Sequence, residues 1–299
     1  MNTTILPLIS CLALGHPVSA PGLWTAVRLV LVLLLLGLLG IGLFFIQRYF
    51  AVFARGNSFR YRVSAAPVRE DSPLRGVRFL VLGSSVTMGM TSYGVSFVEY
   101  LCRRNGCSMK KDAVLASTLA DRTPFSYVRR LRKHTAETDQ IDFFLCQLST
   151  NDAVFHSDLG RISPSDNPEA FDLQTSAGGI EFIIDYVKRT WNCPVIFFIG
   201  TKFDNPRYRK LVNILLSAQD KWGIEVIDLW NDPEMNAVTP EEYRLYMHDG
   251  VHPTRAGYML WWTPRLEEEL CRIVMANRTP KEPGVFQGTL PLDTSLQRF

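Results

Sequence analysis

Three short polar segments, far apart along the chain, contain the residue types that acyl-transfer chemistry needs. Ser85 follows an apolar run, and a serine hydroxyl becomes a useful nucleophile only when a base lies beside it. His252 could be that base, and Asp249, three residues earlier, could hold its imidazole in one tautomer and orientation. The Asn151 amide could donate a hydrogen bond to a developing oxyanion. These four residues form the candidate catalytic set.

Each segment also has a simpler structural interpretation. Ser85 could cap the following helix, and the asparagine could begin a turn. Asp249 could cap a turn, with His248 and His252 as ordinary loop residues. A metal site made of these last three residues is a further alternative, which the absence of any other obvious ligand cluster in the sequence disfavours. The G-x-S-x-G elbow is missing because Thr87 stands where its second glycine would be, which argues against an ordinary α/β-hydrolase.

An alternation of strand-like and helix-like stretches must position these segments. Apolar runs predict five strands, at 77–83, 111–116, 142–148, 194–200 and 224–228. Amphipathic stretches predict helices near 94–105, 125–134, 175–191 and 206–222, and a last one opening at Pro253 and running to about residue 275. Continuous apolar strands alternating with helices favour a doubly wound parallel sheet in a three-layer α/β/α fold.

Such a sheet binds its ligands at the carboxyl ends of the strands. Ser85 and Asn151 both follow predicted strands, and Ala116 ends another. The backbone N–H groups of Ser85 and Ala116 could therefore join the Asn151 amide as donors. The sequence thus predicts an oxyanion hole made by these three residues.

An uncharged, almost wholly apolar stretch at 29–46 predicts a membrane anchor. Its 18 residues, at about 1.5 Å each, are enough to cross a hydrocarbon core of about 30 Å. We expect a transmembrane helix over 23–47, with Trp24 at one interface and Tyr49 at the other. A cleaved signal peptide is the alternative. It is weakened because the apolar stretch is long and starts late, and because the first 15 residues contain no Lys or Arg.

Composition excludes several other classes of protein. The net charge of +3, with no basic block interleaved with aromatics, argues against a nucleic-acid partner. None of the six cysteines has C-x-x-C spacing, so no zinc site is expected, and no motif indicates another metal or a cofactor. Cys102 and Cys107 could form a local bridge or stay free. The predicted division of the chain is an N-terminal segment 1–22, the transmembrane helix 23–47, a juxtamembrane linker 48–75, a catalytic domain 76–276 and a flexible tail 277–299.

The three polar segments, in their order along the chain, resemble the motif blocks of the SGNH (GDSL-type) hydrolase family. Residues 83–87 are similar to its Gly-Asp-Ser block, and residues 149–152 to its Gly-x-Asn-Asp block. Residues 249–252 match its Asp-x-x-His block. The resemblance covers residues 76–272, which is nearly the whole predicted domain.

The resemblance implies a role for each candidate residue. It makes Ser85 the nucleophile, His252 the base, Asp249 the acid that orients it, and Asn151 an oxyanion donor. Three positions depart from the family pattern, because Ser84 replaces an aspartate, Ser149 replaces a glycine, and Ala116 is the nearest match to a glycine that supplies a backbone donor. Alanine keeps that N–H, but a positive φ would be unfavourable for it.

The activity implied is that of a serine esterase, which works through an acyl-enzyme on Ser85 without a cofactor. The ester could be a lipid, an acylated glycan or a small molecule. An acyltransferase using the same site and a non-catalytic binding protein on a hydrolase fold are the alternatives. The oligomeric state stays open.

Two observations disagree about the side of the membrane on which the domain lies. Four arginines at 48, 55, 60 and 62 follow the apolar stretch, against Arg28 before it, and this excess alone favours a cytoplasmic domain. Tethered members of the family that the chain resembles commonly face outward. We therefore expect a single-pass protein with an extracytoplasmic domain.

Overall fold

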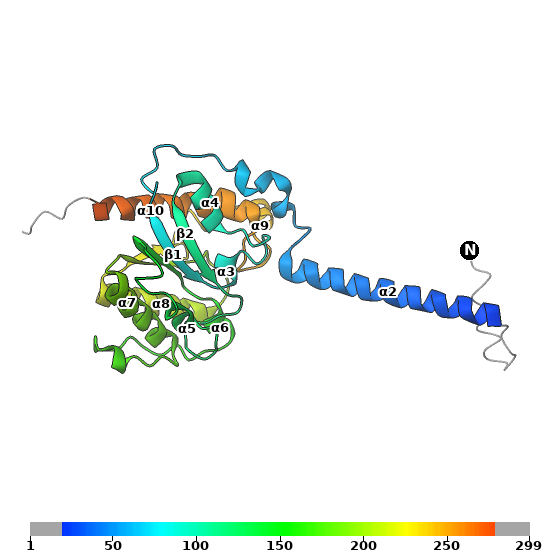
Figure 1. Ribbon diagram of the computed structural model, residues 1–299, viewed down its shortest axis with the longest axis horizontal. Helices are drawn as coiled ribbons and strands as arrows, with labels where there is room; N and C mark the ends of the chain where they lie inside the picture. Colours follow the sequence, from blue (N-terminus) through cyan, green and yellow to red (C-terminus); the bar gives the residue numbers. More distant parts are fainter. Residues whose placement is uncertain (1–19, 279–299) are drawn as a thin grey trace, which may run out of the picture.

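Five parallel strands form the central sheet of the computed structural model, which describes residues 20–278 (Figure 1). Their spatial order is β2-β1-β3-β4-β5. Their bounds are β1 Arg78–Gly83, β2 Ser108–Ala113, β3 Phe143–Gln147, β4 Val195–Ile199 and β5 Glu225–Asp228. Helices cover both faces, so the predicted doubly wound α/β/α architecture is confirmed.

The helices divide between the two faces of the sheet. In the view of Figure 1, α4 Phe97–Asn105 and α10 Thr263–Arg278 lie above the sheet. On the opposite face lie α5 Tyr127–Leu131, α7 Ser176–Trp191 and α8 Pro206–Trp222. The short helices α3 Ser85–Met88, α6 Asn151–Val154 and α9 Pro240–Tyr246 lie in the connections.

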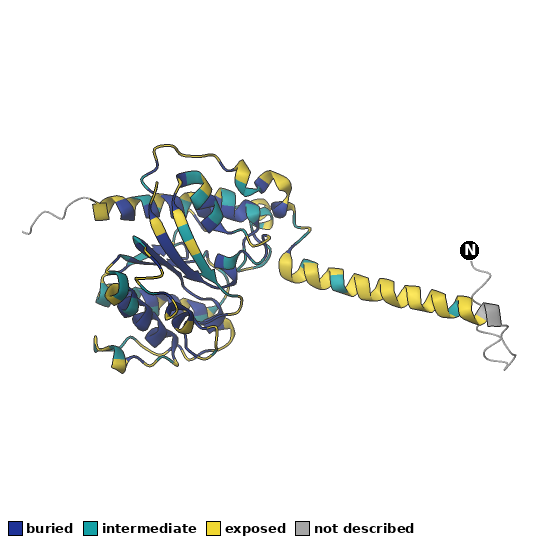
Figure 2. Cartoon of the chain, in the orientation of Figure 1, coloured by how far each residue is buried: buried dark blue, intermediate teal, exposed yellow. Residues whose placement is uncertain are grey.

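Strand alternation explains why both faces are apolar. Phe79 and Val81 of β1 pack into the core under α4 and α10, whereas Leu80 and Leu82 pack into the core under α7 and α8. Because successive side chains point to opposite faces, a strand buried on both sides must be apolar throughout. Figure 2 shows the resulting buried interior of the sheet.

The second strand lies three residues before its predicted position of 111–116. β2 pairs with β1, Ser108 opposite Arg78 and Ala113 opposite Gly83, and it lies at one edge of the sheet. Its polar residues fit an edge, since Lys111 forms an ion pair with Glu99 of α4. The apolar run that suggested a strand is instead the loop after β2.

The last predicted helix is also not a single regular helix. Pro253 pairs with Met247 in an isolated antiparallel bridge, and a π-helical segment, η5 Gly257–Trp262, precedes α10. Cys102 and Cys107, whose pairing the sequence left open, are free thiols in this structure.

The order of the strands creates a switch point between β1 and β3. The chain passes from β1 to β2 on one side and then to β3 on the other. Connections on the two sides diverge at such a point, which leaves a crevice at the carboxyl ends of the two strands. Ser85 and Asn151 both follow these strand ends.

A long helix, α2 Ala20–Phe50, projects away from the domain (Figure 1). Its stretch Leu23–Phe50 is apolar and long enough to cross a membrane, and Figure 2 shows that most of its residues are exposed. The expected N-terminal segment and tail lie mostly outside the described residues. Asn277 and Arg278 complete α10.

The juxtamembrane segment, expected to be a linker, is folded onto the domain. It forms three short 3₁₀ turns, η1 Arg55–Asn57, η2 Phe59–Tyr61 and η3 Val63–Ala65. Buried Asn57 accepts a hydrogen bond from the backbone N–H of Arg255 at 2.9 Å. Sequence composition alone missed this packing because its partners are distant along the chain.

Glu267 of α10 binds the juxtamembrane segment to the domain through Arg69. Its buried carboxylate pairs with Arg69, with Arg104 of α4 at 2.5 Å, and with Asn105 at 3.1 Å. Burial by itself raises the pKa of Glu267, but the hydrogen bonds from Arg104 and Arg69 outweigh it and bring the pKa below its usual value.

Glu267→Ala is expected to lower the free energy of unfolding by about 3 kcal/mol, because it leaves the largely buried guanidinium of Arg104 without its carboxylate partner. A lowered folded-state pKa stabilises the protein above the unfolded pKa of about 4.3, and the contribution is lost as the pH falls through the folded value. The difference in stability between the variant and the normal chain should therefore become smaller at acid pH. Thermal unfolding of the full chain in detergent at several pH values measures it. Glu70→Ala, which removes an exposed carboxylate, should change stability by less than about 0.5 kcal/mol.

Candidate active site

The turn from β1 into α3 presents Ser85 at the switch point. β1 ends at Gly83 and α3 begins at Ser85. A Cβ on Gly83 would lie 2.1 Å from Thr87 Oγ1, so only glycine allows the turn to fold back this closely. α3 ends at once, because Gly89 adopts a left-handed conformation with φ of 78°. The serine therefore stands on a short, tightly closed turn.

The structure brings Ser85, His252 and Asp249 together. Ser85 Oγ and His252 Nε2 are 2.8 Å apart. His252 Nδ1 lies 2.9 Å from Asp249 Oδ2 and 3.0 Å from Oδ1. A serine, an imidazole and a carboxylate in this order form the hydrogen-bonded chain of a serine triad.

Asp249 is held by its own loop. Its Oδ1 accepts hydrogen bonds from the backbone N–H groups of Val251 and His252, each at 2.8 Å. Burial raises the pKa of Asp249, but hydrogen bonding to His252, the charge of that histidine and the two amides outweigh burial and lower the pKa to about 2. The carboxylate is thus ionised near neutral pH and can stabilise an imidazolium.

Asn151 stands at the first position of α6, close to the loop after β2. Its Nδ2 donates to the Ser117 carbonyl at 2.9 Å, and the same carbonyl accepts from Ser149 Oγ at 3.1 Å. Because an amide nitrogen carries two hydrogens, one N–H remains available to an oxyanion. Ser149, a departure from the family pattern, thus joins the loops after β2 and β3.

Ala116 adopts the conformation that favours glycine, with φ of 60°. A positive φ is uncommon and strained for a residue with a Cβ. It persists only where the surrounding structure enforces it. Within the described chain, the backbone N–H groups of Ala116 and Ser85 donate to no acceptor. Both amides are therefore free to bind a ligand oxygen.

Asp152 stabilises the loop after β2, which carries Ala116. It is fully buried and accepts from the backbone N–H of Leu119 at 2.8 Å, from that of Ala120 at 3.1 Å, and from Ser176 Oγ at 2.9 Å. Burial raises the pKa of this carboxyl above its usual value, against the effect of the hydrogen bonds. Its role is to shape the loop that carries Ala116.

Gln147, at the end of β3, is a site residue that the sequence analysis missed. Its Oε1 accepts from the backbone N–H of Ser84 at 3.0 Å and from the backbone N–H and Oγ1 of Thr87 at 3.1 and 2.8 Å. Its Nε2 donates to Ser84 Oγ at 3.0 Å. The side chain thus holds the turn that carries Ser85 from across the switch point. A lone polar residue in the apolar run 143–148 was the available signal.

Arg130 of α5 was missed as well. Its buried guanidinium donates to the Gly83 carbonyl at 2.7 Å and to Ser117 Oγ at 3.2 Å. It also donates to the backbone carbonyl of Asp112 at 2.9 Å and pairs with its carboxylate. One cation therefore joins the ends of β1 and β2 to the loop that supplies the predicted oxyanion donors.

His248 is directed away from this site. Its Nε2 lies 2.8 Å from the backbone carbonyl of Arg48 at the end of α2, and its backbone N–H donates to the His252 carbonyl at 2.9 Å. The structure thus separates His248 from the imidazole beside Ser85, although both residues belong to one short loop.

Comparison with solved structures identifies the fold. A structure from Bacteroides uniformis assigned to the GDSL-like lipases has a TM-score of 0.51 at 14% identity, covering 66% of this chain and 96% of its own. A possible lipase from Chitinophaga pinensis has a TM-score of 0.50 at 12% identity, with coverages of 66% and 98%. The chain has the fold of the GDSL-type hydrolases.

A protein from Lactobacillus plantarum is also similar to this chain, with a TM-score of 0.54 at 17% identity over 68% of this chain and 98% of its own. No family model matches the sequence, and no curated protein matches it. The GDSL-type likeness is therefore one of backbone architecture.

Gln147→Leu is expected to slow the labelling of Ser85 by a fluorophosphonate at least tenfold and to lower the free energy of unfolding by about 2 kcal/mol. The substitution leaves buried donors of the nucleophile turn without an acceptor. Labelling kinetics and thermal unfolding measure the two effects. Gln140→Leu, an exposed position three residues before β3 begins, should alter neither. Unchanged labelling of the Gln147 variant would contradict a positioning role.

Proposed function

We propose that this protein is a serine esterase that hydrolyses acyl esters through an acyl-enzyme on Ser85. The observation that carries the proposal is the 2.8 Å contact between Ser85 Oγ and His252 Nε2, with Asp249 behind the imidazole. A binding protein on this fold has no need of a nucleophile, base and orienting acid in hydrogen-bonded sequence. The GDSL-type fold supports the same chemistry.

The first half of the reaction forms the acyl-enzyme. Ser85 Oγ attacks the ester carbonyl carbon while its proton passes to His252 Nε2. Asp249 stabilises the imidazolium that forms. When the tetrahedral intermediate collapses, the carbon–oxygen bond to the alcohol breaks and His252 returns the proton to the leaving oxygen. The acyl group is then an ester of Ser85.

The second half uses the same groups on water. His252 takes a proton from a water molecule, whose oxygen attacks the acyl carbon, and the proton returns to Ser85 Oγ as the carboxylic acid leaves. In both halves the carbonyl oxygen becomes negatively charged. The free amides of Ser85 and Ala116 and the remaining N–H of Asn151 would stabilise that charge, mainly in the transition states.

We also propose that α2 is retained as a single membrane-spanning anchor. Its length and apolarity meet the requirement for crossing a bilayer, and its last turn is joined to the domain by the contact between His248 and Arg48. A segment destined for cleavage has no need of specific bonds to the folded domain.

Ser85→Ala should abolish fluorophosphonate labelling and the hydrolysis of p-nitrophenyl acetate, because it removes the nucleophile. Asn151→Ala should lower kcat by about 10²–10³-fold with little change in KM, because an oxyanion donor acts mainly in the transition state. Steady-state kinetics on the purified full chain give both results. Full activity of the Ser85 variant would overturn the proposed function.

The catalytic domain is proposed to lie outside the cytoplasm. Protease added to intact cells should then degrade the domain while a cytoplasmic marker protein survives. The same treatment after cell lysis shows that the domain is susceptible. Protection in intact cells followed by loss on lysis would place the domain in the cytoplasm.

A further inference from the structure

The junction between α2 and the domain is tightly bonded. Ala51, the first residue after the helix, is fully buried, and its carbonyl accepts from Asn57 Nδ2 at 2.9 Å. The next carbonyl, of Val52, accepts from the hydroxyl of Tyr93. With the contact from His248, these bonds fix the direction in which the domain leaves the helix.

Exposed apolar side chains are concentrated at the catalytic edge. Within residues 76–278, seven large apolar side chains are exposed, and five of them lie in the connections that follow β1, β2 and β3. We call these five the apolar rim: Tyr93, Leu115, Phe125, Val154 and Phe155. Leu115 and Phe155 lie within a few residues of the predicted oxyanion donors Ala116 and Asn151.

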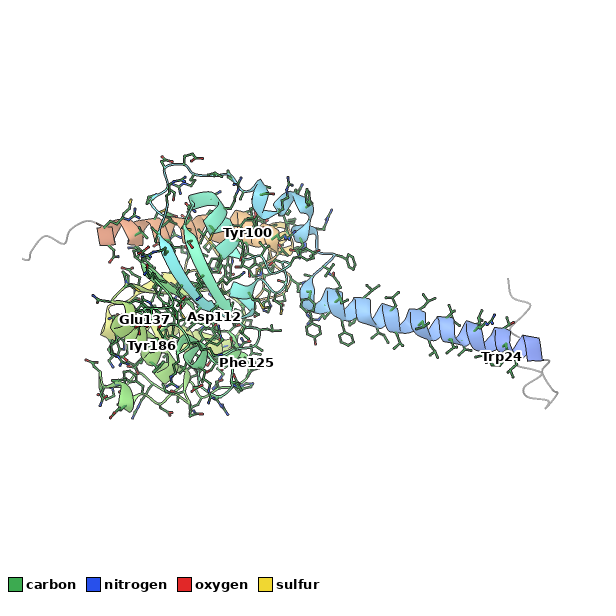
Figure 3. The ribbon with its side chains drawn as sticks, in the orientation of Figure 1. Trp24, Tyr100, Asp112, Phe125, Glu137 and Tyr186 are labelled. Carbon is green, nitrogen blue, oxygen red and sulfur yellow. The ribbon has the colours of Figure 1, made fainter. Side chains whose placement is uncertain are left out.

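The apolar rim faces the side on which α2 is attached. In Figure 1, α3 and α6, at the carboxyl edge of the sheet, lie on the side of the domain from which α2 extends. Figure 3 places Phe125 on that side, whereas Glu137 and Tyr186 lie farther from the helix. Tyr93 belongs to the rim and also bonds the junction, so the rim is continuous with the membrane attachment.

The interior beneath Ser85 has no room for a long acyl chain. The cavity lined by Val86, Gln147 and Trp262 is only about 10 Å³, roughly the minimum for one water molecule. A long apolar group attached to the scissile ester must therefore be accommodated outside this cavity. A bilayer against the rim would accommodate it.

We propose that the apolar rim rests on the membrane surface and that the substrate is a bilayer-resident lipid ester, whose apolar part stays in the membrane while its ester group reaches Ser85. This inference rests on the proposed esterase function. Exposed arginines beside the junction, at 48, 55 and 60, would meet headgroup phosphates. The bonded junction holds the catalytic edge at the level of the headgroups, and the rim aromatics suit that interface.

The test compares two substrates for the full chain reconstituted in vesicles of phosphatidylcholine and phosphatidylglycerol. One substrate is soluble p-nitrophenyl acetate, and the other is 4-methylumbelliferyl oleate embedded in the vesicles. The double variant Phe125→Ser, Phe155→Ser should hydrolyse the embedded ester about tenfold more slowly and the soluble ester within twofold of the normal rate. Met275→Ser removes an equally exposed apolar side chain near the far end of α10 and should change neither rate.

A second variant tests the bonded junction. A six-residue Gly-Ser insertion between Phe50 and Ala51 should reduce hydrolysis of the embedded ester alone, because it frees the orientation of the domain. The same insertion between the exposed Asp166 and Asn167 is the control.

The outcomes separate this inference from the proposed function. Ser85-dependent hydrolysis of the soluble ester, with the embedded ester either untouched or insensitive to the rim and junction variants, overturns the inference and leaves the esterase function standing. A parallel fall on both substrates also overturns it, because the rim would then serve the domain rather than the membrane. Failure of the normal chain to hydrolyse either ester overturns both.

Discussion

The hydrogen bond between Ser85 and His252 is the central interaction of the candidate active site, and other contacts in the structure hold its two partners in place. It joins residues 167 positions apart, so it exists only if the β1 turn and the loop before η5 are held in one place. Two further bonds serve this purpose. The Tyr258 hydroxyl donates to the Val86 carbonyl at 2.6 Å, and Thr91 Oγ1 donates to the Pro253 carbonyl at 2.9 Å. Each links the neighbourhood of the serine to that of the histidine, and their burial shields them from competition with water.

Buried polar side chains hold the turns and loops in place at the carboxyl ends of the strands. Gln147 holds the turn that carries Ser85, Arg130 joins two strand ends to the loop after β2, and Asp152 accepts hydrogen bonds from the backbone of that loop. Burying such groups is unfavourable unless their donors and acceptors are satisfied, and here most of their bonds go to backbone groups. The departures from the GDSL-type pattern fit into this network, since Ser84 binds Gln147 and Ser149 binds the Ser117 carbonyl.

One loop contacts both the end of α2 and Ser85. His248 lies against the Arg48 carbonyl at the end of α2, while His252 contacts Ser85 and Asp249 contacts His252. The segment that follows α2 is held through Asn57 and Glu267, so it is part of the folded domain rather than a flexible linker. These contacts hold the domain in one orientation relative to α2.

Local patterns in the sequence were enough to predict the long apolar helix, strands β1, β3, β4 and β5 to within a residue or two, and the three polar segments. Of those polar segments, the two with Ser85 and Asn151 lie at strand ends, whereas residues 249–252 lie between α9 and η5. These features depend on residue type and periodicity within short windows. The position of β2, the bracing by Gln147 and Arg130, the positive φ of Ala116 and the docking of the juxtamembrane turns were decided only by tertiary structure. Each depends on partners tens of residues away, and an edge strand or a buried polar residue has no local signature that separates it from a loop or a surface residue.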